Sequence, residues 1–151
     1  MSQMEEELGL RLQEEHKALL QLCQVLREHI AAQPATITPA WLEGLRIAFE
    51  RLHAHLQRSI GMKEKDGYLA AVVRMRPALV RRVEAIKRDN AQLLRMGFGI
   101  RNDLAAAHAE ENVLVADLCA RVLRYLGVVN EQEQRENMIV LFAFNQDLGG
   151  D

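Results

Sequence analysis

The chain has 151 residues, of which 49% are hydrophobic and 26% charged, with three prolines. This length suits one domain with its own core, and the composition excludes a disordered chain. The net charge of -2 gives no reason to expect nucleic acid or an anionic membrane as partner, and no apolar run approaches the ~20 residues of a membrane span. The acidic start, Met1 to Leu8, lacks the apolar stretch of a signal peptide. We therefore expect a single cytoplasmic domain over residues 1–151.

Four segments carry apolar residues every three or four positions, the spacing of one helix face. We expect a first helix over roughly 4–32 and a second from Thr38–Pro39, where a hydroxyl N-cap precedes proline. Asp66–Gly67 is expected to interrupt the second helix, and Pro77 to open the third. The inward stripes are Leu12, His16, Leu19, Cys23, Leu26 and Ile30; Leu42, Leu45, Phe49, Leu52, Leu56, Ser59 and Lys63; Leu79, Val83, Ile86, Asn90 and Leu93; and Leu118, Val122, Tyr125, Val129, Gln132, Glu136, Ile139 and Ala143.

The end of the third helix is expected at Gly97 and Gly99, because glycine commonly terminates helices. The polar stretch from Arg101 to Asn112 fits loop and helix equally well. A fourth, longer helix follows, and Gly149–Gly150 closes the chain. Four amphipathic helices without a strand pattern predict an all-α fold, an antiparallel up-down-up-down four-helix bundle.

The two cysteines, Cys23 and Cys119, lie in helical patterns among apolar neighbours and have no metal-binding spacing. We expect both to be buried free thiols of a reducing compartment.

Polar residues interrupt the otherwise apolar stripes. In an antiparallel bundle their positions along the helices allow them to meet in one layer. Buried polar groups without partners cost roughly 1–3 kcal/mol each, so gathering them lets them satisfy one another. Facing helices of bundles build metal and cofactor sites in this way. The residues are His16, Ser59, Lys63, Asn90, Gln132 and Glu136.

These segments resemble hemerythrin-like (HHE-type) domains over nearly the whole chain. The family motifs are Glu-His-x-x-Leu-Leu; His-x-x-x-Glu followed by Gly-Tyr-Leu; a proline start with a later Glu-His pair; and His-Glu-x-x-Glu-Asn with a final Asp-(Ile/Leu)-Gly. The similar segments here are, in order, Glu15–Leu20; Ser59–Leu69; Pro77 with Asp89–Asn90; and Gln132–Asn137 with Asp147–Gly149.

The resemblance implies a hemerythrin-like fold with a diiron site of histidines and carboxylates, and most of those ligands are replaced here. Carried over by position, only His16 and Glu136 remain as plausible ligands. Ser59 stands where a histidine is expected and Lys63 where the bridging glutamate is expected. The other departures from the family's ligand pattern are Asn90 and Gln132, each at a histidine position, and Leu94, which cannot ligate.

Two ligands do not hold iron, so we expect no cofactor. One hypothesis is that a buried pair of Lys63 and Glu136, with Asn90 and Gln132, replaces the metal. The alternative is that Lys63, near its helix end, extends its ammonium group to water. His55 and Glu64 are weaker metal candidates. We expect His55 and its neighbour His53 at the surface, because both lie off the inward stripe.

The preferred functional interpretation is a non-catalytic binding, sensory or regulatory module with an unknown protein partner or small ligand. A second is a metalloprotein that uses the residual ligands, with diiron as cofactor, for oxygen, iron or redox sensing or carriage. A third is a structural helical bundle that forms a homodimer. The chain has no phosphate loop and no nucleophile motif, so we expect no enzyme.

Overall fold

The computed structural model describes residues 3–65 and 67–149, and within these ranges it is helical without strands. Four long helices form the body: α1 (Gln3–Ala31), α2 (Pro39–Lys65), α4 (Val80–Ala106) and α5 (Asn112–Gly149). The short helix α3 (Tyr68–Met75) and the 3-10 turn η1 (Pro77–Leu79) connect α2 to α4. The chain is therefore an all-α helical bundle.

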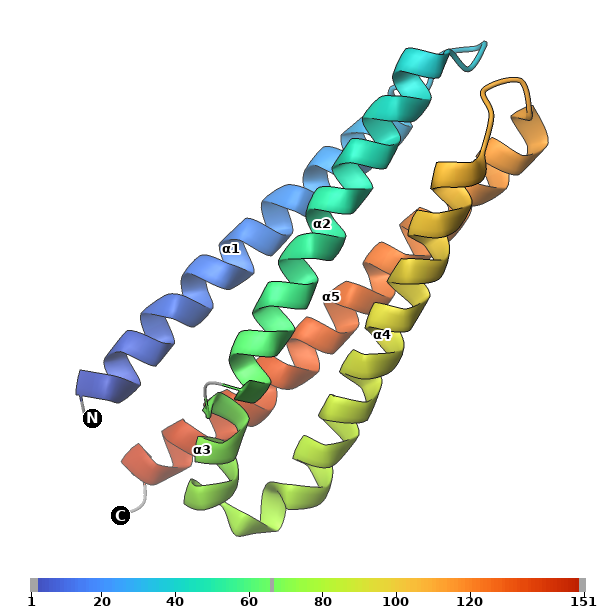
Figure 1. Ribbon diagram of the computed structural model, residues 1–151. Helices are drawn as coiled ribbons and strands as arrows, with labels where there is room; N and C mark the ends of the chain where they lie inside the picture. The colour runs from blue at the N-terminus through green and yellow to red at the C-terminus, as the bar shows by residue number, and fades with distance from the viewer. Residues whose placement is uncertain (1–2, 66, 150–151) are drawn as a thin grey trace.

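The connections between helices gather at the two ends of the molecule (Figure 1). Residues 32–38 and 107–111 lie at one end, whereas α3, η1 and the outer ends of α1 and α5 lie at the other. Helix α1 packs against α2, α2 against α4, and α4 against α5, while α1 and α5 share a smaller contact. Segments far apart in sequence thus lie side by side along the bundle.

Two apolar clusters fill the interior. The larger joins α1, α2, α4 and α5 and includes Leu26, Phe49 and Tyr125, each no more than 1% exposed. The smaller joins α3 and η1 to α4 and α5 and includes Leu69 and Val72 of α3. Burying one such side chain stabilises the fold by about 1.5–3 kcal/mol. These clusters supply the main driving force for the bundle.

The region between the two clusters is polar. The larger cluster reaches Ile60 on α2, Leu93 on α4 and Val129 on α5. The smaller cluster begins at Tyr68 on α3, Ile86 on α4 and Val140 on α5. The residues between these limits include ionised and amide side chains. We call them, together with His16 of α1, the polar layer: His16, Lys63, Asn90, Gln132, Glu133 and Glu136.

The expected helix starts are present. The Thr38 hydroxyl accepts a hydrogen bond from the backbone N–H of Trp41 at 3.0 Å, and α2 begins at Pro39. Pro77 opens η1, which leads directly into α4. Gly67, at φ 84°, has the left-handed conformation that favours glycine. The other residue of the expected break, Asp66, lies outside the described residues, and so does Gly150 at the chain end.

The prediction that Gly97 and Gly99 end the third helix is wrong, since α4 continues through both to Ala106. Glycine inside a helix costs only about 1 kcal/mol, which tertiary packing readily offsets. At the true end, Arg46 of α2 donates from Nε to the Leu104 carbonyl at 2.7 Å, and a second nitrogen donates to the Ala107 carbonyl. A guanidinium group from a neighbouring helix therefore satisfies the last carbonyls of α4.

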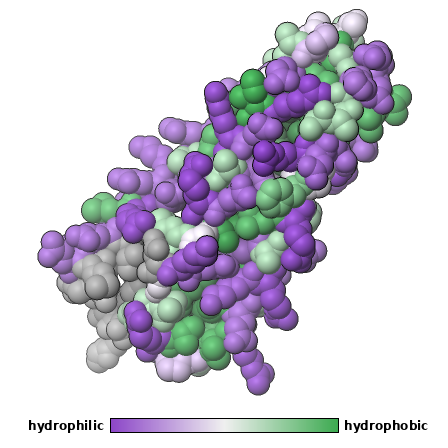
Figure 2. Space-filling view, in the orientation of Figure 1, coloured by the Kyte–Doolittle hydropathy of each residue, from purple (hydrophilic) through white to green (hydrophobic). Residues whose placement is uncertain are grey.

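The surface in the orientation of Figure 1 is largely hydrophilic, with hydrophobic residues showing in patches between polar ones (Figure 2). Within the described ranges, no helix is long and apolar enough to cross a membrane.

Candidate functional site

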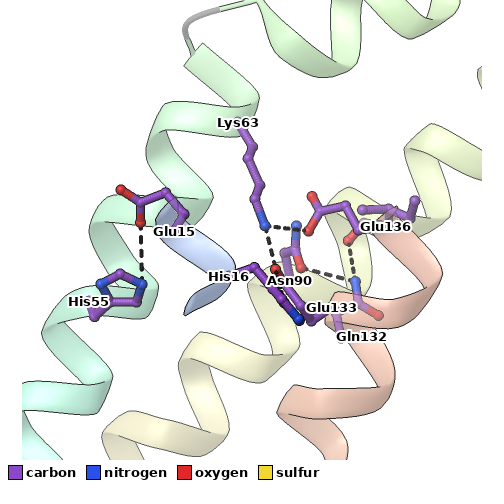
Figure 3. Close-up of polar contacts among 9 residues, drawn as sticks. Glu15, His16, His55, Lys63, Asn90, Gln132, Glu133 and Glu136 are labelled. Carbon is purple, nitrogen blue, oxygen red and sulfur yellow. Dashed lines mark hydrogen bonds and ion pairs between the residues drawn. The ribbon is translucent and has the colours of Figure 1, made fainter. Parts of the chain in front are cut away.

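The centre of the polar layer is Lys63, in the last turn of α2. It follows Leu52, Leu56 and Ser59 on the same inward stripe, and only 2% of the residue is exposed. Its Nζ donates to Glu133 Oε2 at 3.0 Å and to Glu136 Oε2 at 3.1 Å (Figure 3). Lys63 therefore points into the bundle and does not extend to water.

The two carboxylates lie one turn apart on α5, which places both on one helix face. Glu136 is 2% exposed and Glu133 is 7% exposed. Glu133 also contacts His16. The His16 Nδ1 lies 3.3 Å from Glu133 Oε1, and the His16 side chain is 38% exposed. A chain of contacts thus runs from His16 at the surface through Glu133 and Lys63 to Glu136 in the interior.

The amide half of the layer joins α4 to α5. Gln132 Nε2 donates to Asn90 Oδ1 at 2.9 Å and to the Ile86 carbonyl at 3.2 Å (Figure 3). Burial raises the pKa of the Glu136 carboxyl, and the nearby Asn90 amide opposes only a small part of that rise. Yet Asn90 Nδ2 and Glu136 Oε1 stand outside hydrogen-bond geometry, and both are buried with no such partner among the described residues. The amides therefore satisfy each other better than they satisfy the carboxylate.

The ionised groups of the layer share one electrostatic feature, because two carboxylates face a single ammonium. Burial lowers the pKa of Lys63, but Glu136 and Glu133 together raise it above its ordinary value. Burial raises the pKa of Glu136, and Lys63 only partly offsets this. The pKa of the Tyr68 phenol is also raised, by burial and by the same two carboxylates. Each shift favours the protonated form of its group, for Lys63 because of the two carboxylates and for Glu136 and Tyr68 mainly because of burial.

The other expected site residues lie around this centre. Ser59 is 6% exposed, one turn before Lys63 on α2. Glu64 is half-buried, and its Oε1 has no hydrogen-bond partner among the described residues. Leu94 offers the layer no side-chain ligand, and its carbonyl accepts a hydrogen bond from His53 at 3.2 Å.

The expectation that His53 and His55 lie at the surface is wrong. His53 is 0% exposed and His55 is 8% exposed. His55 Nε2 lies 3.2 Å from Glu15 Oε2 on α1, away from the polar layer. The buried face of α2 is wider than a single stripe because α1 and α4 contact it from two sides.

Two residues of the site were missed by sequence reasoning. Glu133 follows Val129 by four positions, so a stripe wider than one residue includes it. Tyr68 lies 2% exposed against Glu133 and Glu136, and its hydroxyl has no hydrogen-bond partner among the described residues. Tyr68 belongs to an apolar stretch and to the Gly-Tyr-Leu segment of the resemblance, and neither indicates that its hydroxyl lies near carboxylates.

The donor set does not fit a diiron centre. Iron needs imidazole and carboxylate ligands around one point, whereas the described residues contain no group of three or more His, Cys, Asp or Glu side chains arranged to hold a metal ion. Lys63 Nζ sits against the oxygens of both buried carboxylates, so a metal ion there would face a fixed positive charge.

Comparisons of the chain with protein-family models, with curated proteins and with solved structures found no match.

Proposed function

We propose that the chain is a hemerythrin-like domain of up-down-up-down order in which an ionic layer stands in place of a metal centre. In this proposal it acts in the cytoplasm as a non-catalytic binding, sensory or regulatory module. The observation that carries the proposal is the position of Lys63, with its ammonium 3.0 and 3.1 Å from two buried carboxylates.

The location of the layer supports the family part of the proposal. His16, Lys63, Asn90, Gln132 and Glu136 occupy the positions that correspond to ligands in the resemblance, and they come together between two apolar clusters. In the resemblance the departures fall mainly on the ligand positions while the surrounding apolar pattern remains, as expected for a site that has lost its metal.

The chemistry of Lys63 supports the non-catalytic part. An ammonium has donors only, so it cannot coordinate a metal while protonated. Its carboxylate neighbours raise its pKa, which opposes the loss of that proton. The layer lacks a nucleophile with an adjacent base, because its carboxylates are engaged by Lys63 and its amides by each other.

Elemental analysis by mass spectrometry tests the proposal on protein purified without chelator after growth in iron-rich medium. We expect no stoichiometric metal in the wild type. A Lys63→Glu variant, which returns a carboxylate to that position, shows whether metal binds once the ammonium group is replaced.

About two irons per chain in the wild type, with absorption bands of an oxo-bridged pair, would overturn the proposal. That result would favour the second interpretation, a metalloprotein that uses His16 and Glu136 after displacement of Lys63.

A further inference from the structure

Helix α5, which runs the length of the bundle, carries apolar residues on two opposite faces (Figure 1). On its inward face Leu118 and Val129 are no more than 1% exposed. On its outward face Val113 is 85% exposed, Met138 70% and Leu141 57%. Single exposed apolar residues are common on protein surfaces, but a line of them along one helix marks an interaction surface. The outward face of α5 therefore has the composition of a face that another helix covers.

The exposed apolar residues belong to one line along α5, which we call the outer seam. It comprises positions 113, 116, 120, 123, 127, 131, 134, 138 and 141, at intervals of three and four residues. Such intervals keep side chains on one face of a helix. Every position is exposed except Ala120, which is half-buried, and Glu131 is the one charged residue of the seam.

The outer seam is symmetric about Gly127. Its intervals run three, four, three and four before Gly127, and four, three, four and three after it. A second copy of α5, antiparallel and related by a two-fold axis at Gly127, therefore places each seam position opposite another seam position. Ala116 then lies opposite Met138 of the second copy, small against large, which lets the two surfaces interdigitate. A Cβ at Gly127 would meet no atom within 4 Å, so the two backbones can approach closely at the axis.

The charges along the seam are complementary in the same pairing. Asp117, Arg124, Glu131 and Arg135 follow each other at intervals of seven, seven and four residues, which places them on one flank of α5. In the antiparallel pair Arg124 lies about one residue from the level of Glu131 of the second copy, and Asp117 about two residues from the level of Arg135. A parallel pairing would instead bring each charge level with its own copy, which is repulsive.

These four charged residues are available for such contacts. All four are exposed. Among the described residues the printed ion pair of the set is that of Arg135 with Asp89, which is 3.7 Å long between side chains at least half exposed. A pair of this kind contributes little to stability, so it does not hold Arg135 in place.

The size of the seam predicts a weak dimer. From Val113 to Leu141 the seam extends about 42 Å, because each helical residue adds about 1.5 Å. A strip of this length and about 12 Å wide covers roughly 500 Å² on each copy, or on the order of 1,000 Å² in total. Specific interfaces begin at about this area, so we expect a dissociation constant of about 1–100 μM.

We propose that the outer seam binds the same seam of a second copy of this chain, and that two antiparallel α5 helices form a two-fold homodimer. This inference goes beyond the proposed function and holds whether or not the polar layer contains metal.

Sedimentation velocity of the full-length protein, from about 1 to 500 μM, tests the proposal. We expect the sedimentation coefficient to rise from that of a monomer to that of a dimer. Met138→Asp should weaken association at least about tenfold, because it places a charge in the apolar contact. Met96→Asp is the matched control: Met96 is 40% exposed on α4, outside the seam, and its substitution should leave association unchanged.

Charge reversal tests the antiparallel pairing. Arg124→Glu and Glu131→Arg should each weaken the dimer about two- to tenfold, because each places like charges at one level. The double variant should restore wild-type association, since it exchanges the two charges of each pair. Arg88→Glu, at an exposed arginine of α4, is the control and should leave the dimer unchanged.

Oxidative cross-linking tests the position of the axis. Gly127→Cys should form an interchain disulfide readily, because the two copies of this position face each other at the axis. Gly99→Cys is the control, at a glycine of α4 that likewise has no atom within 4 Å of its Cβ position, and should form far less.

Three outcomes would overturn the proposal. A monomer at every concentration would mean that a second copy does not cover the seam, which would leave a different protein as its occupant. A dimer that persists unchanged in Met138→Asp would use another surface. Failure of the double charge reversal to restore association, with equal cross-linking of Gly127→Cys and Gly99→Cys, would reject the antiparallel pairing.

Discussion

The polar layer and the aromatic region around His53 both bury polar groups, but they satisfy them differently. In the aromatic region His53 and Tyr125 donate to the Leu94 and Leu93 carbonyls at 3.2 and 2.9 Å. Phe49 stacks on His53, and Phe98 meets its edge with ring centroids 4.4 Å apart. In the polar layer the partners of Lys63 among the described residues are two charged groups of another helix, Glu133 and Glu136.

The difference shows that neutral groups and charges need different support. A helix carbonyl has a second lone pair, so a neutral donor is accommodated by whichever helix lies beside it. A buried ammonium requires opposite charge, and removing its partner leaves an uncompensated ion. The layer is thus the more specific region and the more sensitive one.

The largest expected effect is the loss of the central cation. Lys63→Met should destabilise the fold by about 3–5 kcal/mol, because two buried carboxylates lose their partner. Urea unfolding followed by circular dichroism measures the change. Lys87→Met, at an exposed lysine of α4, is the control and should shift stability by no more than about 0.5 kcal/mol. An unchanged unfolding midpoint for Lys63→Met would contradict the ionic description of the layer.

The aromatic region is expected to respond most strongly to added volume. A Cβ at Gly97 would lie 2.6 Å from Tyr125 Oη and 2.7 Å from His53 Nε2, whereas Gly99 has nothing within 4 Å. Gly97→Ala should therefore destabilise by about 1–2 kcal/mol, since overpacking exceeds the gain in helix propensity. Gly99→Ala should stabilise by about 0.5–1 kcal/mol. Thermal melts of both variants test this, and stabilisation by Gly97→Ala would show that the contact relaxes freely.

A smaller effect distinguishes the two buried tyrosines. Tyr125→Phe should destabilise by about 1 kcal/mol, because it removes the hydrogen bond to the Leu93 carbonyl. Tyr68→Phe should leave stability unchanged or raise it by about 1 kcal/mol, because the Tyr68 hydroxyl is buried without a partner among the described residues. Chemical denaturation of both variants measures their free energies of unfolding. Equal losses of stability in Tyr125→Phe and Tyr68→Phe would contradict the prediction.

The smallest expected effect concerns stability in acid, to which His53 and Glu136 contribute in opposite directions. Burial lowers the pKa of His53 from 6.5, so below that pH the unfolded state binds the proton first and stability falls. Burial raises the pKa of Glu136 above 4.5, so as the pH falls towards 4.5 the folded state binds the proton first and stability rises. His53→Phe should flatten the loss below pH 6.5, and Glu136→Gln should remove the gain.

Unfolding free energies across pH 4–7 measure both slopes. His108→Gln is the control, because His108 is exposed and its substitution should leave the profile unchanged. If the unfolding free energy of His53→Phe varies with pH as that of the wild type does, this histidine contributes nothing to the acid response.

Much of the candidate site was predictable from spacing. Lys63, Asn90, Gln132 and Glu136 fall on predicted stripes, and all four are buried. The contact of Lys63 with Glu136 is present, while the second carboxylate, Glu133, was missed because a single line of residues describes too narrow a face.

The sequence by itself determined the all-helical class, the helix starts at Pro39 and Pro77 and most of the inward face. These features depend on local rules: a hydroxyl N-cap, proline at the first turn, and apolar residues every three or four positions. Only the tertiary structure decided that α4 continues past Gly97, that His53 is buried and that Lys63 has two carboxylate partners. Each of these depends on which side chain approaches from a neighbouring helix, such as Arg46 at the end of α4, and no local pattern encodes that approach.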